Sequence, residues 1–479
     1  ITVAARPLFK HRILTVAQEA GSPRSHICAV IAPPHIQTFT QSGGYVTPAL
    51  GPNLRLLDPS KTDTSVIDSG SRYISSASLI GNLFISDGLN YFYLDPRSNS
   101  PTYTNGKVEL WQPKTSGYMP QRAKLVFSWR DRIGLSRCPD DPQNFYLSAT
   151  NDPFDWDLNP PTPTITQAFV GNLTPAGLLP DLPNAFIPYT DDVLIVLCDH
   201  SIWQVSGNPL RGGEIDRISG VVGGSFGKPY CVDPEGAIYF HGSRGGIFVM
   251  APKSTPIRLS TESIDADLAE IDLNSYFVEL VWDDRAQGVH VLQLPYGAGG
   301  TPVQHWFFER RTKAWIPQKY GRSGSTGNQP TAVAVYDGDS PNDRRILLAG
   351  EDRRIGYFDT SAKGDRSGAT NGSGAIYSYA LIGPIVTREQ NDRRSRLCHL
   401  EVTLASDRGG CNCEVYMSDV PDVIGGAAWS GELQPGYNRV NVRARGRYIF
   451  LRLYNSESGR DWAFESASAS IADAGRVRS

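Results

Sequence analysis

The sequence predicts an all-β protein, in which an irregular six- or seven-bladed β-propeller is followed by a C-terminal β-sandwich domain. Short apolar alternations bounded by Gly, Pro, Asn or Asp recur along the whole chain, a pattern typical of antiparallel strands joined by tight turns. Gly and Pro make up 81 of 479 residues (47 + 34), or 17%, against an average of about 12%, which indicates many turns. Helical periodicity is nearly absent.

The first clear unit is the hairpin at residues 78–94, where Asp87-Gly88 provides the positive-φ turn between two apolar strands. Similar strand pairs follow at 125–135 with 144–149, 192–198 with 201–205, 238–240 with 247–250, 288–294 with 304–309, and 345–349 with 355–359. Each unit therefore predicts part of one blade.

The spacing of these units favours a propeller. One aromatic landmark per unit gives intervals of 53, 57, 45, 60 and 49 residues, taken between Tyr93, Tyr146, Trp203, Phe248, Phe308 and Tyr357. A blade repeat is about 40–50 residues, and loop insertions lengthen it. We therefore assign the propeller to residues 51–362. The N-terminal segment, residues 1–50, is expected to close the propeller partly by completing the final blade with one strand.

One segment departs from the strand pattern. Residues 260–273 carry apolar side chains at Ile264, Leu268 and Ile271, behind Ser and Thr residues suited to capping. This predicts a short amphipathic helix between blades, with its apolar stripe docked on the propeller.

A polar, glycine-rich run at residues 363–374 has linker composition and marks the end of the propeller. The remaining residues, 375–479, again alternate in short strands and predict a compact β-sandwich of about a hundred residues.

Charge and cysteine content exclude several classes of protein. The net charge is −3, from 46 basic and 49 acidic residues, so no overall basic field favours generic nucleic-acid binding. The seven cysteines are odd in number and scattered, which predicts reduced, mostly buried thiols. Cys411 and Cys413 lack a second Cys/His pair at zinc spacing, so we interpret them as adjacent strand or turn thiols and expect no metal. No apolar stretch is long enough for a membrane span.

Catalytic and cofactor motifs are missing as well. The chain contains no G-x-S-x-G and neither phosphate-binding glycine pattern, and its eight histidines are dispersed. The acid pairs Asp140-Asp141, Asp191-Asp192 and Asp283-Asp284 could serve a glycosidase, but acid pairs are also ordinary turn formers. We expect no enzyme activity and no cofactor.

Arginine is abundant: the 46 basic residues comprise 36 Arg and ten Lys. Between residues 375 and 479, thirteen Arg and no Lys face twelve acids (13 − 12 = +1), so the sandwich is nearly neutral. Arginine clusters in such a domain favour pairing within or between subunits over phosphate binding. The candidate subunit-interface residues are Arg393, Arg394, Arg396, Arg443 and Arg445.

Several motifs together resemble the tail nozzle, or tail tubular, proteins of short-tailed bacteriophages. The resemblance spans roughly residues 78–479 and runs from the propeller to the sandwich. The residues that carry it are Trp129, Arg130, Arg132, Asp152, Pro153, Trp156, Gly223, Gly224, Arg445, Gly446, Arg447, Tyr448 and Trp462.

That resemblance implies a structural subunit of the virion, made in the bacterial host cytoplasm, that forms a six-fold ring around the channel for the ejected genome. The implied partners are a homo-oligomeric ring, the tail adaptor ring above it, tail fibres or tailspikes, and the DNA in transit. A mildly acidic chain suits such a channel, because each Lys or Arg contact to phosphate would retard the DNA.

Two alternatives remain open at this point. One is a glycan-degrading propeller whose paired carboxylates lie at the channel mouth. The other is a tail-tip receptor-binding protein in which Trp306 and Trp315 stack on host glycan, although strand-core positions explain these two residues as well.

Overall fold

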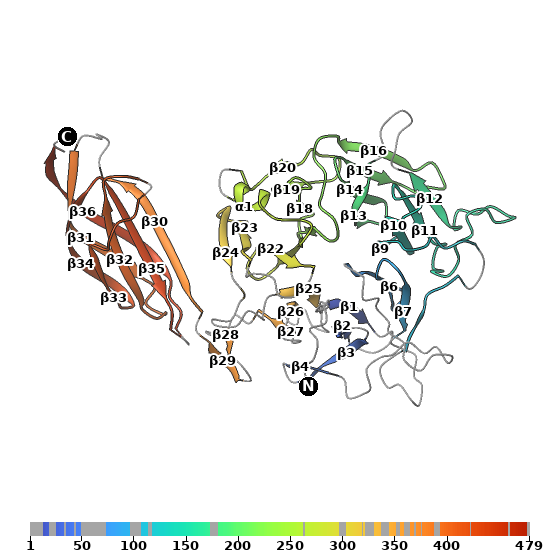
Figure 1. The fold of residues 1–479 in the computed structure, drawn as a ribbon, viewed down its shortest axis with the longest axis horizontal. Helices are drawn as coiled ribbons and strands as arrows, with labels where there is room; N and C mark the ends of the chain where they lie inside the picture. The colour runs from blue at the N-terminus through green and yellow to red at the C-terminus, as the bar shows by residue number, and fades with distance from the viewer. Residues whose placement is uncertain are drawn as a thin grey trace, which may run out of the picture. The chain divides into compact units, whose positions relative to one another are not determined.

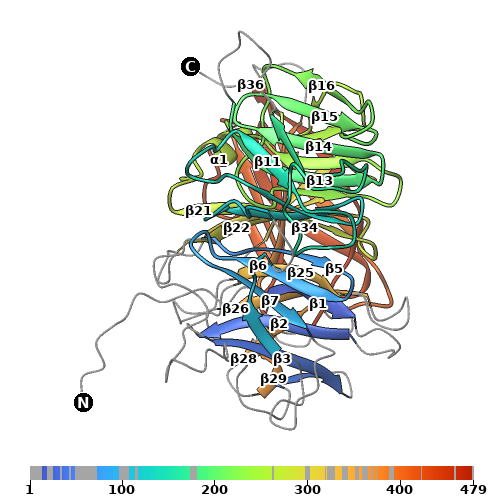
Figure 2. The same ribbon diagram turned by 90° about the vertical axis from the view of Figure 1, so that its right-hand side faces the viewer.

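The computed structural model describes the backbone of four strands between residues 13 and 48. It then describes residues 73–95, 107–113, 117–172, 181–261, 264–296, 303–318, 320, 330–336, 344–350 and 355–358 of the first compact unit. In the second unit it describes 365–367, 370–374, 376–387, 393–421, 423–457 and 460–476. The two units meet in sequence between Phe358 and Asp359. Strands dominate both (Figures 1 and 2).

The described part of the first unit contains seven antiparallel sheets, each built from consecutive strands, and we number them as blades 1–7. Blade 1 comprises β1 (Ile13–Gln18), β2 (Ser25–Ala32), β3 (His35–Ser42) and β4 (Tyr45–Pro48). Blade 2 comprises β5 (Ser75–Leu79), β6 (Asn82–Ser86), β7 (Tyr91–Asp95) and β8 (Lys107–Leu110). Blade 3 comprises β9 (Leu125–Trp129), β10 (Arg132–Ser136), β11 (Asn144–Leu147) and β12 (Phe169–Asn172).

Blade 4 comprises β13 (Pro183–Thr190), β14 (Val193–Cys198), β15 (Ile202–Ser206) and β16 (Glu214–Ser219), and blade 5 comprises β17 (Tyr230–Val232), β18 (Ile238–His241), β19 (Ile247–Met250) and β20 (Ile257–Arg258). Blade 6 comprises β21 (Tyr276–Asp283), β22 (Gly288–Pro295), β23 (His305–Glu309) and β24 (Ala314–Gln318). Blade 7 comprises β25 (Pro330–Tyr336), β26 (Arg345–Gly350) and β27 (Ile355–Tyr357).

The blades form a closed ring, as expected for a propeller. The first strands of neighbouring blades contact each other: β5 meets β9, β9 meets β13, β17 meets β21, and β21 meets β25. Blades 4 and 5 share a core that includes Ile187 and Phe240. The ring closes because β1 contacts both β25 of the last blade and β5 of the second. The all-β prediction and the propeller are therefore confirmed, and the blade number is seven.

The N-terminal segment differs from its prediction. We expected residues 1–50 to lend one strand to the final blade, whereas β1–β4 form a complete four-stranded blade of their own. Each described sheet of the first unit is built from strands consecutive in sequence, so blade 1 joins blades 2 and 7 by contact rather than through a shared sheet. The sequence does carry an aromatic residue at repeat spacing here, because Phe39 on β3 precedes Tyr93 by 54 residues (93 − 39), but the prediction began the repeat at Tyr93 and so did not count this segment as a blade.

The helix between blades is present as α1 (Asp265–Ala269). Its predicted stripe is buried against blades 5 and 6, where Ile264, Leu268 and Ile271 share a core with Trp282 and Trp306. Burial of this stripe, rather than capping, holds the helix, because its N-cap is Ile264 and no side chain caps it.

The second unit contains a sandwich of two antiparallel sheets (Figure 1). The four-stranded sheet has the order β30 (Ser378–Val386), β35 (Tyr448–Asn455), β32 (Cys411–Ser418), β33 (Trp429–Leu433). The three-stranded sheet has the order β34 (Gly436–Gly446), β31 (Arg393–Leu404), β36 (Phe464–Arg476). Their inner faces share a core that includes Leu397, Val415 and Leu451. The predicted sandwich is thus confirmed.

The predicted linker at residues 363–374 contains a short hairpin, β28 (Asp365–Ser367) with β29 (Thr370–Gly374), although its composition indicated no strand. Backbone pairing forms this hairpin without apolar side chains, so hydrophobic periodicity could not reveal it.

The thiols follow the sequence prediction over the described residues. Five of the six described cysteines are buried, Cys398 is half-buried, and none forms a disulfide. Cys411 and Cys413 lie two residues apart on β32 and point into the sandwich core, and burial raises their thiol pKa values to about 11 and about 12. In the described part of the chain, no helix is long and apolar enough to span a membrane.

Candidate functional site

The family-like strand motif at Trp129–Arg132 joins blade 3 to blade 4 and fixes a loop of blade 3. The indole of Trp129 donates to the carbonyl of Thr190 (2.9 Å), and the guanidinium of Arg130 contacts the carboxylate of Asp192 (2.6 Å). Arg130 and Asp131 form the β9–β10 turn with φ +53° and +54°, the positive values that a two-residue hairpin turn requires.

Arg132 is buried at the start of β10, where its guanidinium donates to the carbonyls of Ser148 (2.8 Å), Gln167 (2.5 Å) and Ile165 (3.0 Å). Burial, followed by the nearby charge of Arg130, lowers the pKa of Arg132 to about 10. Three carbonyl acceptors compensate for burying this cation, so Arg132 holds the loop before β12 against β10.

The second motif, around Asp152, Pro153 and Trp156, forms the core between blades 2 and 3. The carbonyl of Pro153 accepts hydrogen bonds from the indoles of Trp111 (2.9 Å) and Trp156 (3.0 Å), and both rings are almost fully buried. Asp152 accepts from the backbone N–H of Phe154 (2.9 Å), which sets the turn. These residues act through packing.

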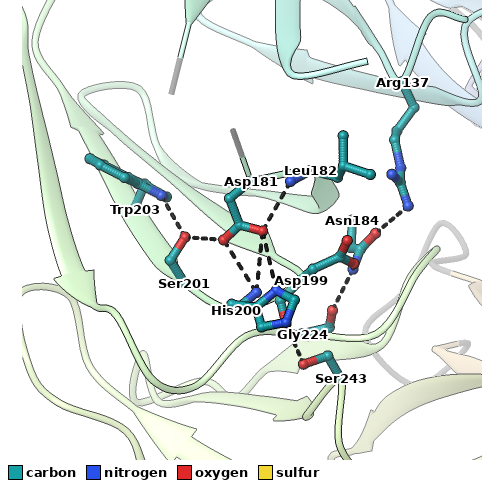
Figure 3. Close-up of polar contacts among 10 residues, drawn as sticks. All are labelled: Arg137, Asp181, Leu182, Asn184, Asp199, His200, Ser201, Trp203, Gly224 and Ser243. Carbon is teal, nitrogen blue, oxygen red and sulfur yellow. Dashed lines mark hydrogen bonds and ion pairs between the residues drawn. The ribbon is translucent and has the colours of Figure 1, made fainter. Parts of the chain in front are cut away.

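The third motif, Gly223-Gly224, lies in a polar network that joins blades 3, 4 and 5 (Figure 3). Asn184 is its centre: its amide donates to Asp199 (2.5 Å) and to the carbonyl of Gly224 (2.8 Å), and its oxygen accepts from Arg137 (2.8 Å). A Cβ on Gly223 would lie 2.2 Å from the carbonyl oxygen of Cys198, so only glycine permits this approach.

Within this network, Asp181, Asp199 and His200 have ligand atoms within 4.8 Å of one another, the one group with metal-like spacing among the described residues. The Asp181 carboxylate already accepts from the backbone N–H of Leu182 (3.0 Å) and of His200 (3.2 Å) and from the hydroxyl of Ser201 (2.5 Å). Asp199 is held by Asn184. These hydrogen bonds give both carboxylates a structural role, which is to hold the β14–β15 turn in place.

The acid pairs considered for glycosidase chemistry lie at turns and have structural partners. Asp141 accepts from Asn144 and Tyr146, and Asp192 pairs with Arg130. Asp283 accepts from two backbone N–H groups of its own turn and contacts His290, while Asp284 pairs with Arg344 of blade 7 (2.9 Å). A further cross-blade contact joins Arg310 of blade 6 to Asp233 and Glu235 of blade 5.

The candidate interface arginines come together on the outer face of the three-stranded sandwich sheet. Arg396 of β31 and Arg445 of β34 are direct cross-strand neighbours, and Arg443 lies two residues along the same face. All three are exposed, and no carboxylate among the described residues pairs with them. Arg394 pairs with Asp419 (3.0 Å). Arg393 begins β31, and its side chain lies outside the described residues.

The C-terminal motif residues are distributed over the sandwich rather than gathered. Gly446 is buried where a Cβ would lie 2.9 Å from the carbonyl oxygen of Ser418, and the carbonyl of Arg447 accepts from Thr387. Tyr448 begins β35, and Trp462 packs on the sandwich core while its indole donates to Ser378 (2.9 Å).

Two features escaped sequence reasoning. Arg137 donates to Asn184 in the network of Figure 3, and burial lowers the pKa of its guanidinium. It directly follows β10 and belongs to none of the motifs that the sequence singled out. On the outer face of the four-stranded sandwich sheet, Arg452 contacts Glu414 (3.1 Å) and Tyr377 (2.5 Å). The alternation of side chains along β32 and β35 indicates which residues of each strand share a face. It does not indicate that Glu414 and Arg452 are cross-strand neighbours.

No family model and no curated protein matches this chain. Among solved structures, the chain is similar to YCF48 bound to D1 peptide, with 11% identity over 76% of this chain and 96% of that one, at a TM-score of 0.41.

It is also similar to PorZ, a surface component of the type-IX secretion system of Porphyromonas gingivalis, with 13% identity over 78% of this chain and 42% of that one, at a TM-score of 0.39. A third similar structure is the extracellular domain of a putative hybrid two-component system of B. thetaiotaomicron, with 10% identity over 75% of this chain and 52% of that one, at a TM-score of 0.35.

Proposed function

We propose that this chain is a structural subunit of a bacteriophage tail, forming the ring-shaped nozzle through which the genome is ejected. The proposal places it in the virion as a six-fold ring, below an adaptor ring and beside tail fibres or tailspikes. The observation that carries it is the ordered set of family-like motifs running from the propeller to the sandwich.

The positions of those motifs support a structural role. In the propeller, Trp129, Arg130, Trp156 and Gly223 each join blades or permit blades to approach. A nozzle needs a stiff body, and a closed propeller has few free sheet edges. Residues that make the propeller rigid are expected at contacts between blades. Catalytic or ligand-binding residues would instead converge on a cleft.

The unneutralised arginines support self-association. Arg396 and Arg445 are like charges facing each other across two strands, an arrangement that costs free energy in an isolated domain. We assign Arg393, Arg394, Arg396, Arg443 and Arg445 to a subunit interface, where arginine is a favoured anchor.

The receptor-binding alternative relied on two tryptophans as a glycan platform. Trp306 is buried, and Trp315 packs on the same core, with its indole directed to the carbonyl of Leu259 (3.4 Å). Packing in the strand core explains why tryptophan occupies these two positions. The two residues therefore give no support to the receptor-binding alternative.

The proposal is tested on purified particles of the phage that encodes this chain. Antibody labelling and particle imaging should find the protein at the tail, in six copies per particle and below the portal. Preimmune serum on the same particles is the control. Absence of the protein from purified particles would refute the proposal.

A further inference from the structure

We propose that the sandwich docks head to tail on a second copy of this chain: the apolar loop at residues 419–428 of one copy enters an open edge, between β30 and β36, of the next. The inference rests on the proposed ring function and specifies which surfaces meet.

The open edge is seen first on β36. Paired residues in antiparallel strands point to the same face, so Ile471, Ala469 and Ala467 share the inner face with Leu397, Leu400 and Val402. The three β31 residues are buried, whereas Ile471 is 36% exposed and both alanines are exposed. Inward-facing side chains of β36 are therefore left uncovered.

The same holds for β30. Ile385 pairs with the buried core residue Ile449 and so faces inward, yet it is 45% exposed. β30 and β36 are edge strands of the two opposed sheets. The hydrogen bond from Trp462, just before β36, to Ser378 of β30 places them on one side of the sandwich. The apolar interior is consequently accessible along this side.

The complementary surface is the loop at residues 419–428. Its Val420, Val423 and Ile424 are 49%, 56% and 42% exposed, and a Cβ on Gly425 would meet nothing within 4 Å. The loop leads into β33, which is the edge strand opposite β30. One edge of the domain thus protrudes with apolar side chains, and the other edge is open.

Both surfaces lie at one level of the sheet. Tyr448 of β35 pairs with Val386 at the end of β30 on one side and with Ser418, just before the loop, on the other. Copies placed side by side at the same level would therefore bring loop and open edge together by rotation with little rise. A head-to-tail contact with little rise closes into a ring when its rotation divides a full turn, as the proposed ring requires.

A second copy is the occupant that explains both surfaces. Exposed apolar patches and uncovered edge strands are liabilities that soluble proteins usually cover. A foreign partner on the loop would leave the open edge uncovered, and the reverse also holds. A copy of the same domain covers both with a single repeated contact.

The test measures self-association of the full chain by native mass measurement over a concentration series. Ile424→Asp should weaken oligomer formation at least about tenfold, because it would place a charge in the apolar edge. The matched control is Val221→Asp, which adds the same charge at a 79% exposed site in the loop after β16 of the propeller, outside the sandwich, and should leave assembly unchanged.

A cysteine pair provides a direct test. Val423→Cys with Ile471→Cys should give a ladder of disulfide-linked oligomers on oxidation, since these positions lie on opposite edges of one domain and can meet only between copies. Val423→Cys with Val221→Cys should give no ladder above that of the parent chain.

Undiminished oligomer formation by Ile424→Asp, or a disulfide ladder from the Val423→Cys with Val221→Cys pair, would overturn this interface and leave the nozzle proposal standing. A wild-type chain that stays monomeric would also overturn it. Absence of the protein from phage particles is the separate result that would overturn the proposed function.

Discussion

Three arginines of the propeller and one arginine pair of the sandwich differ in what surrounds them. In the propeller, Arg130, Arg132 and Arg310 each contact a carboxylate or carbonyl of a neighbouring blade or loop. In the sandwich, Arg396 and Arg445 face each other, exposed, without an ion-pair partner among the described residues.

The apolar side chains of the units differ in the same direction. The propeller ring closes on itself, and each blade is covered by two neighbours. The sandwich leaves Ile385 and Ile471 uncovered on faces that point into its own core. A closed ring of blades meets its packing and hydrogen-bonding needs within one chain, whereas an open-edged sandwich leaves part of them to a partner.

The largest expected effect is on the propeller core. Trp156→Ala should lower the free energy of unfolding of the propeller by about 3–5 kcal/mol, because it removes a buried indole and leaves a cavity between blades 2 and 3. Denaturant unfolding followed by fluorescence would measure this. Trp156→Phe, which keeps a ring, should cost less. A parallel loss in the sandwich transition would contradict the independence of the two units.

Acid should weaken the propeller first. Burial lowers the pKa values of His241 and His305 from 6.5 to about 4, so the unfolded state binds more protons between these values. This stabilisation is present above pH 6.5 and is lost as the pH falls toward 4, up to about 3 kcal/mol for each imidazole.

The measurement is the unfolding midpoint of each unit between pH 7 and pH 4. The sandwich should hold longer, because the pKa of Glu414 is lowered by its hydrogen bond with Tyr416, and that contribution is lost only below about pH 4.5. His305→Gln should flatten the propeller profile. A propeller midpoint independent of pH would exclude neutral buried histidines.

A matched pair of substitutions compares the arginines directly. Arg132→Met should cost the propeller about 2–3 kcal/mol, because it leaves three carbonyls without their charged donor. Arg396→Met should change sandwich stability by less than about 0.5 kcal/mol, since it removes an exposed charge and relieves repulsion by Arg445. Equal losses from the two substitutions would remove the contrast between the units.

Local patterns predicted the elements well. Asp87 accepts from the N–H groups of Leu89 and Asn90 at the expected turn, and the stripe of Ile264, Leu268 and Ile271 is buried as its spacing indicated. The inward positions of Cys411 and Cys413 follow from strand alternation. These features depend on the period of two or of 3.6 residues and on turn chemistry, which act over a few neighbouring residues.

The sequence by itself therefore determined most of the strands and turns, the helix and the division into a propeller and a sandwich, but not the four-stranded blade 1 or the hairpin at residues 365–374. Only the tertiary structure decided that the N-terminal strands form a blade of their own, that Arg137 of blade 3 bonds Asn184 of blade 4, and that Arg396 faces Arg445. It also decided that Ile471 and Ile385 lie on an open edge. These outcomes depend on which segments, distant along the chain, lie against each other, and strand periodicity carries no information about that choice.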